Sequence, residues 1–191
     1  PGRGGSQQSL PLLGGQDHGG GDEVGQHRGV VRQVGVVRVE VDDVFAAARL
    51  GLPSGLPVVA GGVEASLRRI AHYVYWSDTV RRSILLDSKA DLVVFGMGER
   101  TVLEVARRLG AGESIRDLRD LRGCAYRLGA SEAPPSGADT LELPTFEAVA
   151  GDPIAFCTMT RIAHLETNPH NARRLVQRYG RESIVVNPPA L

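Results

Sequence analysis

The sequence predicts an α/β fold, a Rossmann-like parallel sheet with flanking helices. This prediction rests on two short apolar runs, on the glycine turn and helical pattern that follow each run, and on the overall composition. Two short apolar runs, residues 57–60 and 91–95, are each followed by a glycine turn and then by a helical pattern. Buried parallel strands have such continuous apolar runs, and each needs a crossover, usually a helix, to reach its neighbour. Hydrophobic residues make up 42% and charged residues 23% of the 191-residue chain, as in an ordinary globular domain.

Residues 1–55 differ in composition from the rest of the chain. They contain 13 of the 24 glycines, and residues 14–29 are polar without any periodicity. Such a segment buries too little apolar surface to offset the entropy of ordering it. We therefore predict a poorly ordered segment over residues 1–55, with a short strand at 37–42 and a short helix at 44–50, followed by an α/β domain over residues 56–191.

From residue 56 onward, hydrophobic spacing predicts the elements in order. A helix over residues 64–75 is followed by a second over residues 79–87, which Ser77 and Asp78 would cap. The strand at 92–95 leads into an amphipathic helix that Gly110 ends. The later elements are a short helix at 115–121, a strand at 123–128, a loop at 131–139, an extended segment at 141–144, a short helix at 146–149, a helical segment at 152–179 with a break at 168–169, and a strand at 184–186.

Two glycine loops form the candidate ligand site. They follow the two predicted strands, so both would lie at the carboxyl edge of the sheet, where ligands of open α/β sheets bind. Backbone N–H groups at a helix start can face an anion, although neither loop has the GxGxxG or P-loop spacing. Tight turns without a ligand fit these residues about as well. The candidate ligand-binding residues are Gly61, Gly62, Glu64, Ser66, Gly96, Gly98 and Glu99.

A basic and aromatic patch lies between the two loops in the sequence. Arginines beside large aromatic side chains could bind a phosphate or carboxylate, or could form a contact with another domain. The alternative is that the arginines pair with nearby carboxylates and the aromatics pack. For contact with another domain, the candidates are Arg68, Arg69, His72, Tyr73, Tyr75, Trp76, Arg81 and Arg82.

Composition and motif searches exclude several classes of function. The formal net charge is zero, so there is no strong case for nucleic acid, and no apolar run reaches the length of a membrane span. Cys124 and Cys157 are far apart and lack metal-ligand spacing, which predicts buried thiols in a cytoplasmic protein. His18 and His27, near acidic residues, match no ligand pattern either. We predict no metal site and no catalytic residue in this chain.

Residues 61–100, GGVEASLRRIAHYVYWSDTVRRSILLDSKADLVVFGMGER, closely resemble the YgiQ-like branch of the radical SAM proteins. The resemblance continues through LRDLRGCAY at 118–126, LPTF at 143–146 and residues 168–189, which end in RESIVVNPP. It implies an amino-terminal cobalamin-binding-like domain whose glycine loops face a radical SAM core. The cobalamin motif DxHxxG is absent, because Asp17, His18 and Gly19 have the wrong spacing, so no bound cobalamin is predicted.

The same resemblance implies cofactors for a longer protein. In the family, three cysteines in a CxxxCxxC motif hold a 4Fe–4S cluster that binds S-adenosylmethionine. This chain lacks the motif, so the resemblance implies an inert fragment whose partner is a carboxyl-terminal radical SAM core. Such a domain would cover that core or present substrate to it. The alternatives are a free-standing module that binds a small anion and a protein-interaction scaffold.

Residues 1–55 do not resemble the family, which carries a first strand and helix ahead of the first glycine loop. This departure predicts an incomplete sheet. It also predicts that the segment is a shifted reading frame joined near Gly55. Reading the genomic DNA in all frames tests this, because another frame upstream of Leu56 should restore the family pattern.

Overall fold

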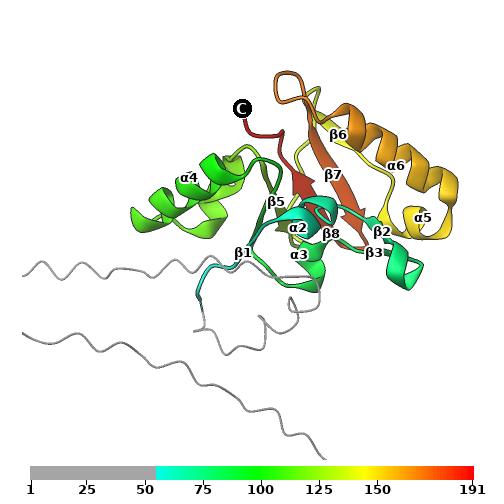
Figure 1. Cartoon of the computed structure of the whole chain (residues 1–191), viewed down its shortest axis with the longest axis horizontal. Helices are drawn as coiled ribbons and strands as arrows, with labels where there is room; N and C mark the ends of the chain where they lie inside the picture. Colours follow the sequence, from blue (N-terminus) through cyan, green and yellow to red (C-terminus); the bar gives the residue numbers. More distant parts are fainter. Residues whose placement is uncertain (1–54) are drawn as a thin grey trace, which may run out of the picture. The chain divides into compact units, whose positions relative to one another are not determined.

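The computed structural model describes residues 55–191, and these residues form a six-stranded mixed sheet and a two-stranded hairpin. Figure 1 shows their arrangement. The order of the large sheet is β1-β4-β5-β8-β7-β6. Its strands are β1 (Val59–Ala60), β4 (Leu92–Val94), β5 (Cys124–Leu128), β6 (Thr140–Glu142), β7 (Arg174–Tyr179) and β8 (Glu182–Val186), and the hairpin consists of β2 (His72–Val74) and β3 (Thr79–Arg81). The predicted α/β class is confirmed.

The strand pairing is mixed rather than parallel throughout. The pairs β1/β4 and β6/β7 are parallel, whereas β4/β5, β5/β8 and β8/β7 are antiparallel. The two parallel pairs therefore lie at the two sides of the sheet, and the antiparallel strands occupy its centre.

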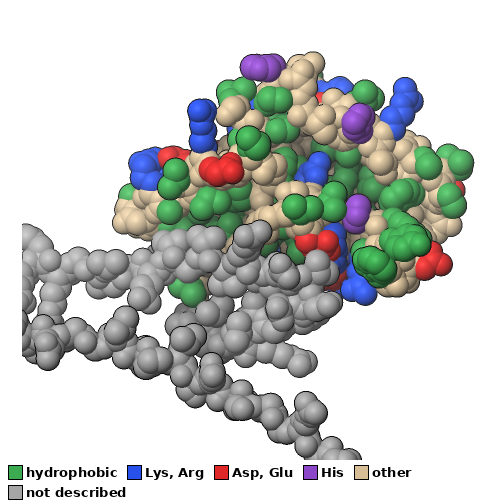
Figure 2. Space-filling view, in the orientation of Figure 1, with side chains coloured by type: hydrophobic (Ala, Val, Ile, Leu, Met, Phe, Trp, Pro, Cys, Tyr) green, Lys and Arg blue, Asp and Glu red, His purple; other side chains and the backbone are tan. Residues whose placement is uncertain are grey.

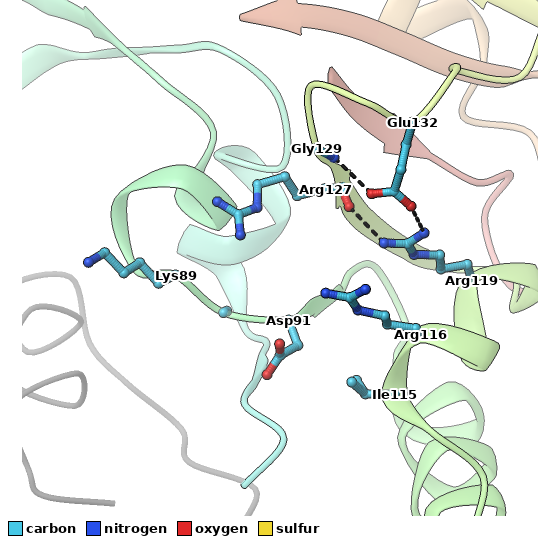
Figure 3. Close-up of a pocket in the computed structure, with 9 residues that line it drawn as sticks. Lys89, Asp91, Ile115, Arg116, Arg119, Arg127, Gly129 and Glu132 are labelled. Carbon is cyan, nitrogen blue, oxygen red and sulfur yellow. Dashed lines mark hydrogen bonds and ion pairs between the residues drawn. The ribbon is translucent and has the colours of Figure 1, made fainter. Parts of the chain in front are cut away.

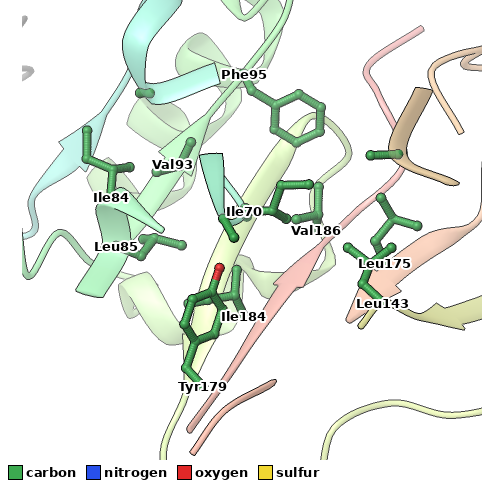
Figure 4. Packing of buried hydrophobic residues seen from close by; sticks show 14 of the residues in the cluster. Ile70, Ile84, Leu85, Val93, Phe95, Leu143, Leu175, Tyr179, Ile184 and Val186 are labelled. Carbon is green, nitrogen blue, oxygen red and sulfur yellow. The ribbon is translucent and has the colours of Figure 1, made fainter. Parts of the chain in front are cut away.

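Helices cover both faces of the sheet. They are α2 (Val63–Leu67), α3 (Ile84–Asp87), α4 (Glu99–Gly110), α5 (Phe146–Gly151) and α6 (Pro153–Leu165), with short 3-10 helices η1 (Tyr75–Ser77) and η2 (Ile115–Asp120). One face packs against α2, α3, α5 and α6 in a single buried cluster. Figure 4 shows part of this cluster, with Ile84 and Leu85 of α3 near Val93 of the sheet. The other face packs against α4 and η2. Successive side chains of β4 point to opposite faces of the sheet. Val93 therefore packs in the cluster on the first face, whereas Leu92 and Val94 pack in the cluster on the other face.

The predicted helices at 64–75 and 79–87 are wrong in their extent. The first ends at Leu67, and the chain then forms the β2–β3 hairpin, in which Tyr73 pairs with Val80. The second is only α3, and its N-cap is Ser83 rather than Ser77 or Asp78. β-branched and aromatic residues dominate the hairpin, and such residues favour strands. The apolar residues of this region happen to match helical spacing, although much of the region forms strands.

The predicted helical segment at 152–179 is also too long. α6 begins as expected, because Asp152 accepts hydrogen bonds from the backbone N–H groups of Ile154 and Ala155 and Pro153 occupies the first turn. It ends at Leu165, and the expected break at 168–169 is a turn after which β7 begins. Leu175 and Val176 are buried on opposite faces, so β7 is a strand covered on both sides.

Most other predicted elements are present. Strands β1, β4 and β5, helix α4 and the short helix η2 fall within the expected residues, and β6 overlaps the extended segment. Strand β8 begins two residues before the predicted strand, and α5 ends two residues after the predicted helix. The predictions for residues 1–54, including the strand at 37–42, the helix at 44–50 and the setting of His18 and His27, lie outside the described residues. Among residues 55–191, no helix has both the length and the apolar composition that a bilayer span requires.

Candidate functional site

Both glycine loops lie at one edge of the sheet, as predicted. β1 and β4 pair in parallel, with Val59 opposite Leu92 and Ala60 opposite Val93. The loop at 61–62 and the loop at 96–98 therefore leave neighbouring strands in the same direction. We call this side of the sheet the glycine-loop edge.

Backbone geometry explains the glycines of these loops. Gly62 and Gly96 have φ values of 94° and 70°, a region that side-chain-bearing residues seldom adopt. Gly98 is required for a different reason, because a Cβ atom there would lie 2.6 Å from a methyl group of Val94. The glycines thus allow two tight turns to leave the sheet side by side.

Ser66 ties the two loops together. Its hydroxyl donates to the carbonyl of Gly62 at 2.8 Å and accepts from the backbone N–H of Gly96 at 3.3 Å. Glu64, in the first turn of α2, lies 3.6 Å from Arg68, whereas Glu99 is exposed at the start of α4. The polar groups of the loops consequently bond to each other and to nearby side chains.

The chain after β8 also reaches the glycine-loop edge, which sequence reasoning did not foresee. Because β5 and β8 are antiparallel, the start of β5 and the end of β8 meet there. Gly123 donates its N–H to the carbonyl of Pro188 at 2.7 Å, and Arg122 donates to Pro189 at 3.0 Å. The buried Asn187 side chain donates to the carbonyl of Leu121 at 2.7 Å. Only the pairing of the central strands reveals this contact, and no sequence pattern signals it.

Apolar side chains project from the glycine-loop edge into solvent. Met97, in the loop at 96–98, is 83% exposed, and Val63 and Leu67, the first and last residues of α2, are 79% and 46% exposed. Isolated exposed apolar residues are common, but three on one loop and the helix after the neighbouring loop are typical of a contact surface. Sequence reasoning missed these residues because it considered only the glycines and polar groups.

Arg68 and Arg69 lie against the protein rather than on its surface. Arg68 is 4% exposed and pairs with Asp87 and Glu64. The Arg69 guanidinium lies 4.8 Å from the ring centroid of Phe95, and burial lowers the pKa of Arg69. The ion pair with Asp87 joins the end of α2 to α3, so Arg68 stabilises the crossover between β1 and β4.

The rest of the predicted patch lies on the hairpin. Tyr75 and Trp76 form its tip and are 76% and 92% exposed, with their rings edge to face. The Tyr73 hydroxyl donates to Asp78 at 2.7 Å. Figure 2 shows hydrophobic side chains beside charged ones in this region. His72 is half-buried, and burial lowers its pKa, while Arg81 and Arg82 are exposed. The structure thus separates the arginines near α2 from the aromatic tip.

The two cysteines have different surroundings. Cys124 is buried in β5, where burial raises its pKa to about 12, as expected for an inert thiol. The prediction that Cys157 is buried is wrong, because this residue is exposed on α6. The packed side of α6 is apolar and its exposed side carries Thr158 and Thr160, so a small side chain such as Cys157 fits either side. Among the described residues, no group of three or more His, Cys, Asp or Glu side chains could hold a metal ion.

Together, these features define an α/β domain in which two glycine loops leave neighbouring parallel strands at one edge of the sheet. The Radical SAM N-terminal family matches residues 45–191, so the chain belongs to this family. The match begins ten residues before the predicted domain boundary at residue 55.

Curated relatives agree with this membership. A UPF0313 protein of Geobacter sulfurreducens is 55% identical over 135 residues, which cover 71% of this chain and 22% of the relative. One from Bradyrhizobium diazoefficiens is 48% identical over 153 residues, covering 71% of this chain and 23% of the relative. The UPF0313 protein YgiQ of Escherichia coli is 39% identical over 190 residues, covering 71% of this chain and 25% of the relative. The chain thus spans about a quarter of their length. No solved structure matches.

Proposed function

We propose that this chain serves as the amino-terminal domain of a radical SAM enzyme, and that its glycine-loop edge contacts the radical SAM core. One observation carries the proposal: the exposed Val63, Leu67 and Met97 lie at the edge that also holds the segment after β8. The family match supports it, as does the fact that the match covers only 22% of the Geobacter sulfurreducens relative. In this proposal, the edge covers the core or presents substrate to it.

The 4Fe–4S cluster and S-adenosylmethionine belong to the core in this proposal. Cluster ligands are cysteine thiolates, and the whole sequence contains only two cysteines. Cys124 is buried in the sheet and Cys157 lies exposed on a helix, so these residues do not fit a cluster. The chain's own contribution would be binding and coverage by its loops.

Association with a core lacking its own amino-terminal domain tests the proposal. The partner would be the Geobacter sulfurreducens relative, expressed without its matching segment and mixed with this chain. A carboxylate introduced into an apolar contact is left without a partner, so Val63→Asp with Met97→Asp should weaken association at least about tenfold. Ile154→Asp, at a 73% exposed position on α6, is the matched control and should leave affinity unchanged.

Two results would contradict the proposal. One is the absence of association between the unmodified chain and the core. The other is equal weakening by the Ile154→Asp control, which would mean that the effect is not specific to the glycine-loop edge. Circular dichroism of each variant establishes that the fold is retained.

A further inference from the structure

A polar pocket lies at the edge of the sheet opposite the glycine-loop edge, at the other end of the strands. It forms where the chain enters β4 and leaves β5, beside η2, and its volume is about 140 Å³ (Figure 3). Four cationic side chains and two carboxylates line it. The lining residues are Lys89, Ala90, Asp91, Ile115, Arg116, Arg119, Arg127, Gly129 and Glu132.

One ion pair forms a fixed wall of the pocket. Arg119 donates to Glu132 at 2.5 Å and to the carbonyl of Arg127 at 3.2 Å. Glu132 also accepts from the N–H of Gly129 at 2.9 Å, and the hydrogen bond from Arg119 lowers the pKa of Glu132. Because both partners are held by further hydrogen bonds, this pair is a structural part of the pocket.

The remaining cations are available to a ligand. Arg116 and Lys89 form no ion pair with any of residues 55–191. Arg127 pairs with Glu182 at 3.2 Å, but both side chains are more than a third exposed, and such pairs contribute about 0–1 kcal/mol. Figure 3 shows Arg116 and Arg127 projecting into the space between Lys89 and Arg119. A bound anion could therefore engage both guanidinium groups.

Size and charge together indicate the class of ligand. Pockets for drug-sized ligands occupy about 300–1,000 Å³, so this pocket suits a smaller group. Guanidinium groups bind carboxylate and phosphate oxygens through paired N–H donors. Cations that approach from separate elements match a tetrahedral oxyanion better than a planar carboxylate. Asp91 keeps its negative charge, but its carboxylate accepts the N–H of Val58 at 2.9 Å and is directed away from Arg116 and Arg127 (Figure 3).

We propose that this pocket binds a phosphate group, either free phosphate or a small phosphate monoester, between Arg116 and Arg127, with Lys89 at its rim. The site is separate from the glycine-loop edge and does not depend on docking of a core. Its ligand would connect β4, β5 and η2, and so would stabilise one end of the sheet.

Calorimetric titration of the 191-residue chain tests the proposal. Inorganic phosphate, glycerol 3-phosphate and acetate are titrated separately at matched ionic strength. Phosphate or the monoester should bind, and whichever is tighter identifies the source of the group. Arg116→Gln and Arg127→Gln should each weaken this binding at least about tenfold, because each removes a charged donor. Arg161→Gln, at an exposed position on α6, is the matched control and should bind like the unmodified chain.

A second measurement uses the fact that Lys89 is the only lysine of the chain. Reductive methylation with ¹³C-formaldehyde labels its amine and the amino-terminal amine, and a Lys89→Arg variant identifies the Lys89 signal. That NMR signal should shift on addition of phosphate but not in the Arg116→Gln variant. The proposal is overturned if neither phosphate compound binds, if acetate binds as tightly, or if the Arg161→Gln control is weakened equally.

Discussion

At the scale of single residues, local surroundings decide what each candidate side chain can do. Arg68 and Arg69 are adjacent in the sequence, yet the buried Arg68 pairs with the partly buried Asp87 and Arg69 lies over Phe95. Gly62 and Gly98 are required for different reasons. Gly62 adopts a positive φ, whereas a side chain at Gly98 would collide with Val94. Residue type alone does not distinguish these roles.

The two cysteines give a direct test at this scale. In the folded chain only Cys157 should react with a thiol reagent, because Cys124 is buried. The raised pKa of Cys124 also leaves about a thousandfold less of the reactive thiolate than a cysteine of ordinary pKa has. Labelling should therefore count one thiol in buffer and two in denaturant. A folded Cys157→Ala variant should remain unlabelled, and rapid labelling of that variant would contradict the buried setting of Cys124.

At the scale of elements, strong and local signals were predictable from the sequence. The apolar runs of β1 and β4, the amphipathic α4 and the Asp152–Pro153 start of α6 all appear as expected. The β2–β3 hairpin and β7 were predicted as helix, because each is defined by pairing with a distant or facing strand. Spacing within a short window does not contain that information.

The same limit applies to the candidate site. The two loops could be placed at one edge, since parallel pairing of β1 with β4 followed from the apolar runs. The contacts of Asn187 and Pro188 at that edge depend on β5 lying beside β8. That pairing joins segments far apart in the chain, which explains why the sequence did not reveal it.

Gln177 provides the test at the element scale, because it joins the β1–β4 crossover to the sheet. It is fully buried; its oxygen accepts from the Ala71 N–H at 2.8 Å and the Tyr179 hydroxyl at 2.6 Å, and its nitrogen donates to Pro144 at 3.0 Å. Gln177→Leu should reduce the free energy of unfolding by about 2–3 kcal/mol, since buried polar groups lose their partner.

Urea unfolding measures this change, and Arg178→Leu is the control in the same strand. Arg178 is exposed, and within residues 55–191 its one ion pair is with the exposed Glu142, so its replacement should change stability by less than about 1 kcal/mol. Equal losses of unfolding free energy in the two variants would show that the buried hydrogen bonds of Gln177 contribute no more than the exposed ion pair of Arg178.

At the scale of the described domain, stability should be greatest where the antiparallel strands meet. β5 and β8 each have a partner on both sides, and Ala125, Ile184 and Val185 are fully buried. The β2–β3 hairpin is a separate two-stranded sheet with an exposed tip, and an isolated hairpin is only marginally stable. The molecule therefore combines a rigid centre with a less protected hairpin.

Amide hydrogen exchange tests this distribution. The backbone N–H groups of β5 and β8 should exchange only through global unfolding, whereas those of the hairpin should exchange faster by local opening. Mass spectrometry of proteolytic peptides resolves the two regions. Equal protection of hairpin and central strands would show that the domain opens as a single unit.

The position of β8 has a consequence for how the protein is made. β8 is the last strand of the described chain, yet it lies between β5 and β7 at the centre of the sheet. During synthesis, β5 and β7 leave the ribosome before the strand that joins them, and they remain unpaired on that side until Val186 has emerged. Exposed strand edges at this stage favour aggregation. The nascent chain therefore depends on rapid completion of β8, or on a chaperone that shields the two waiting strands.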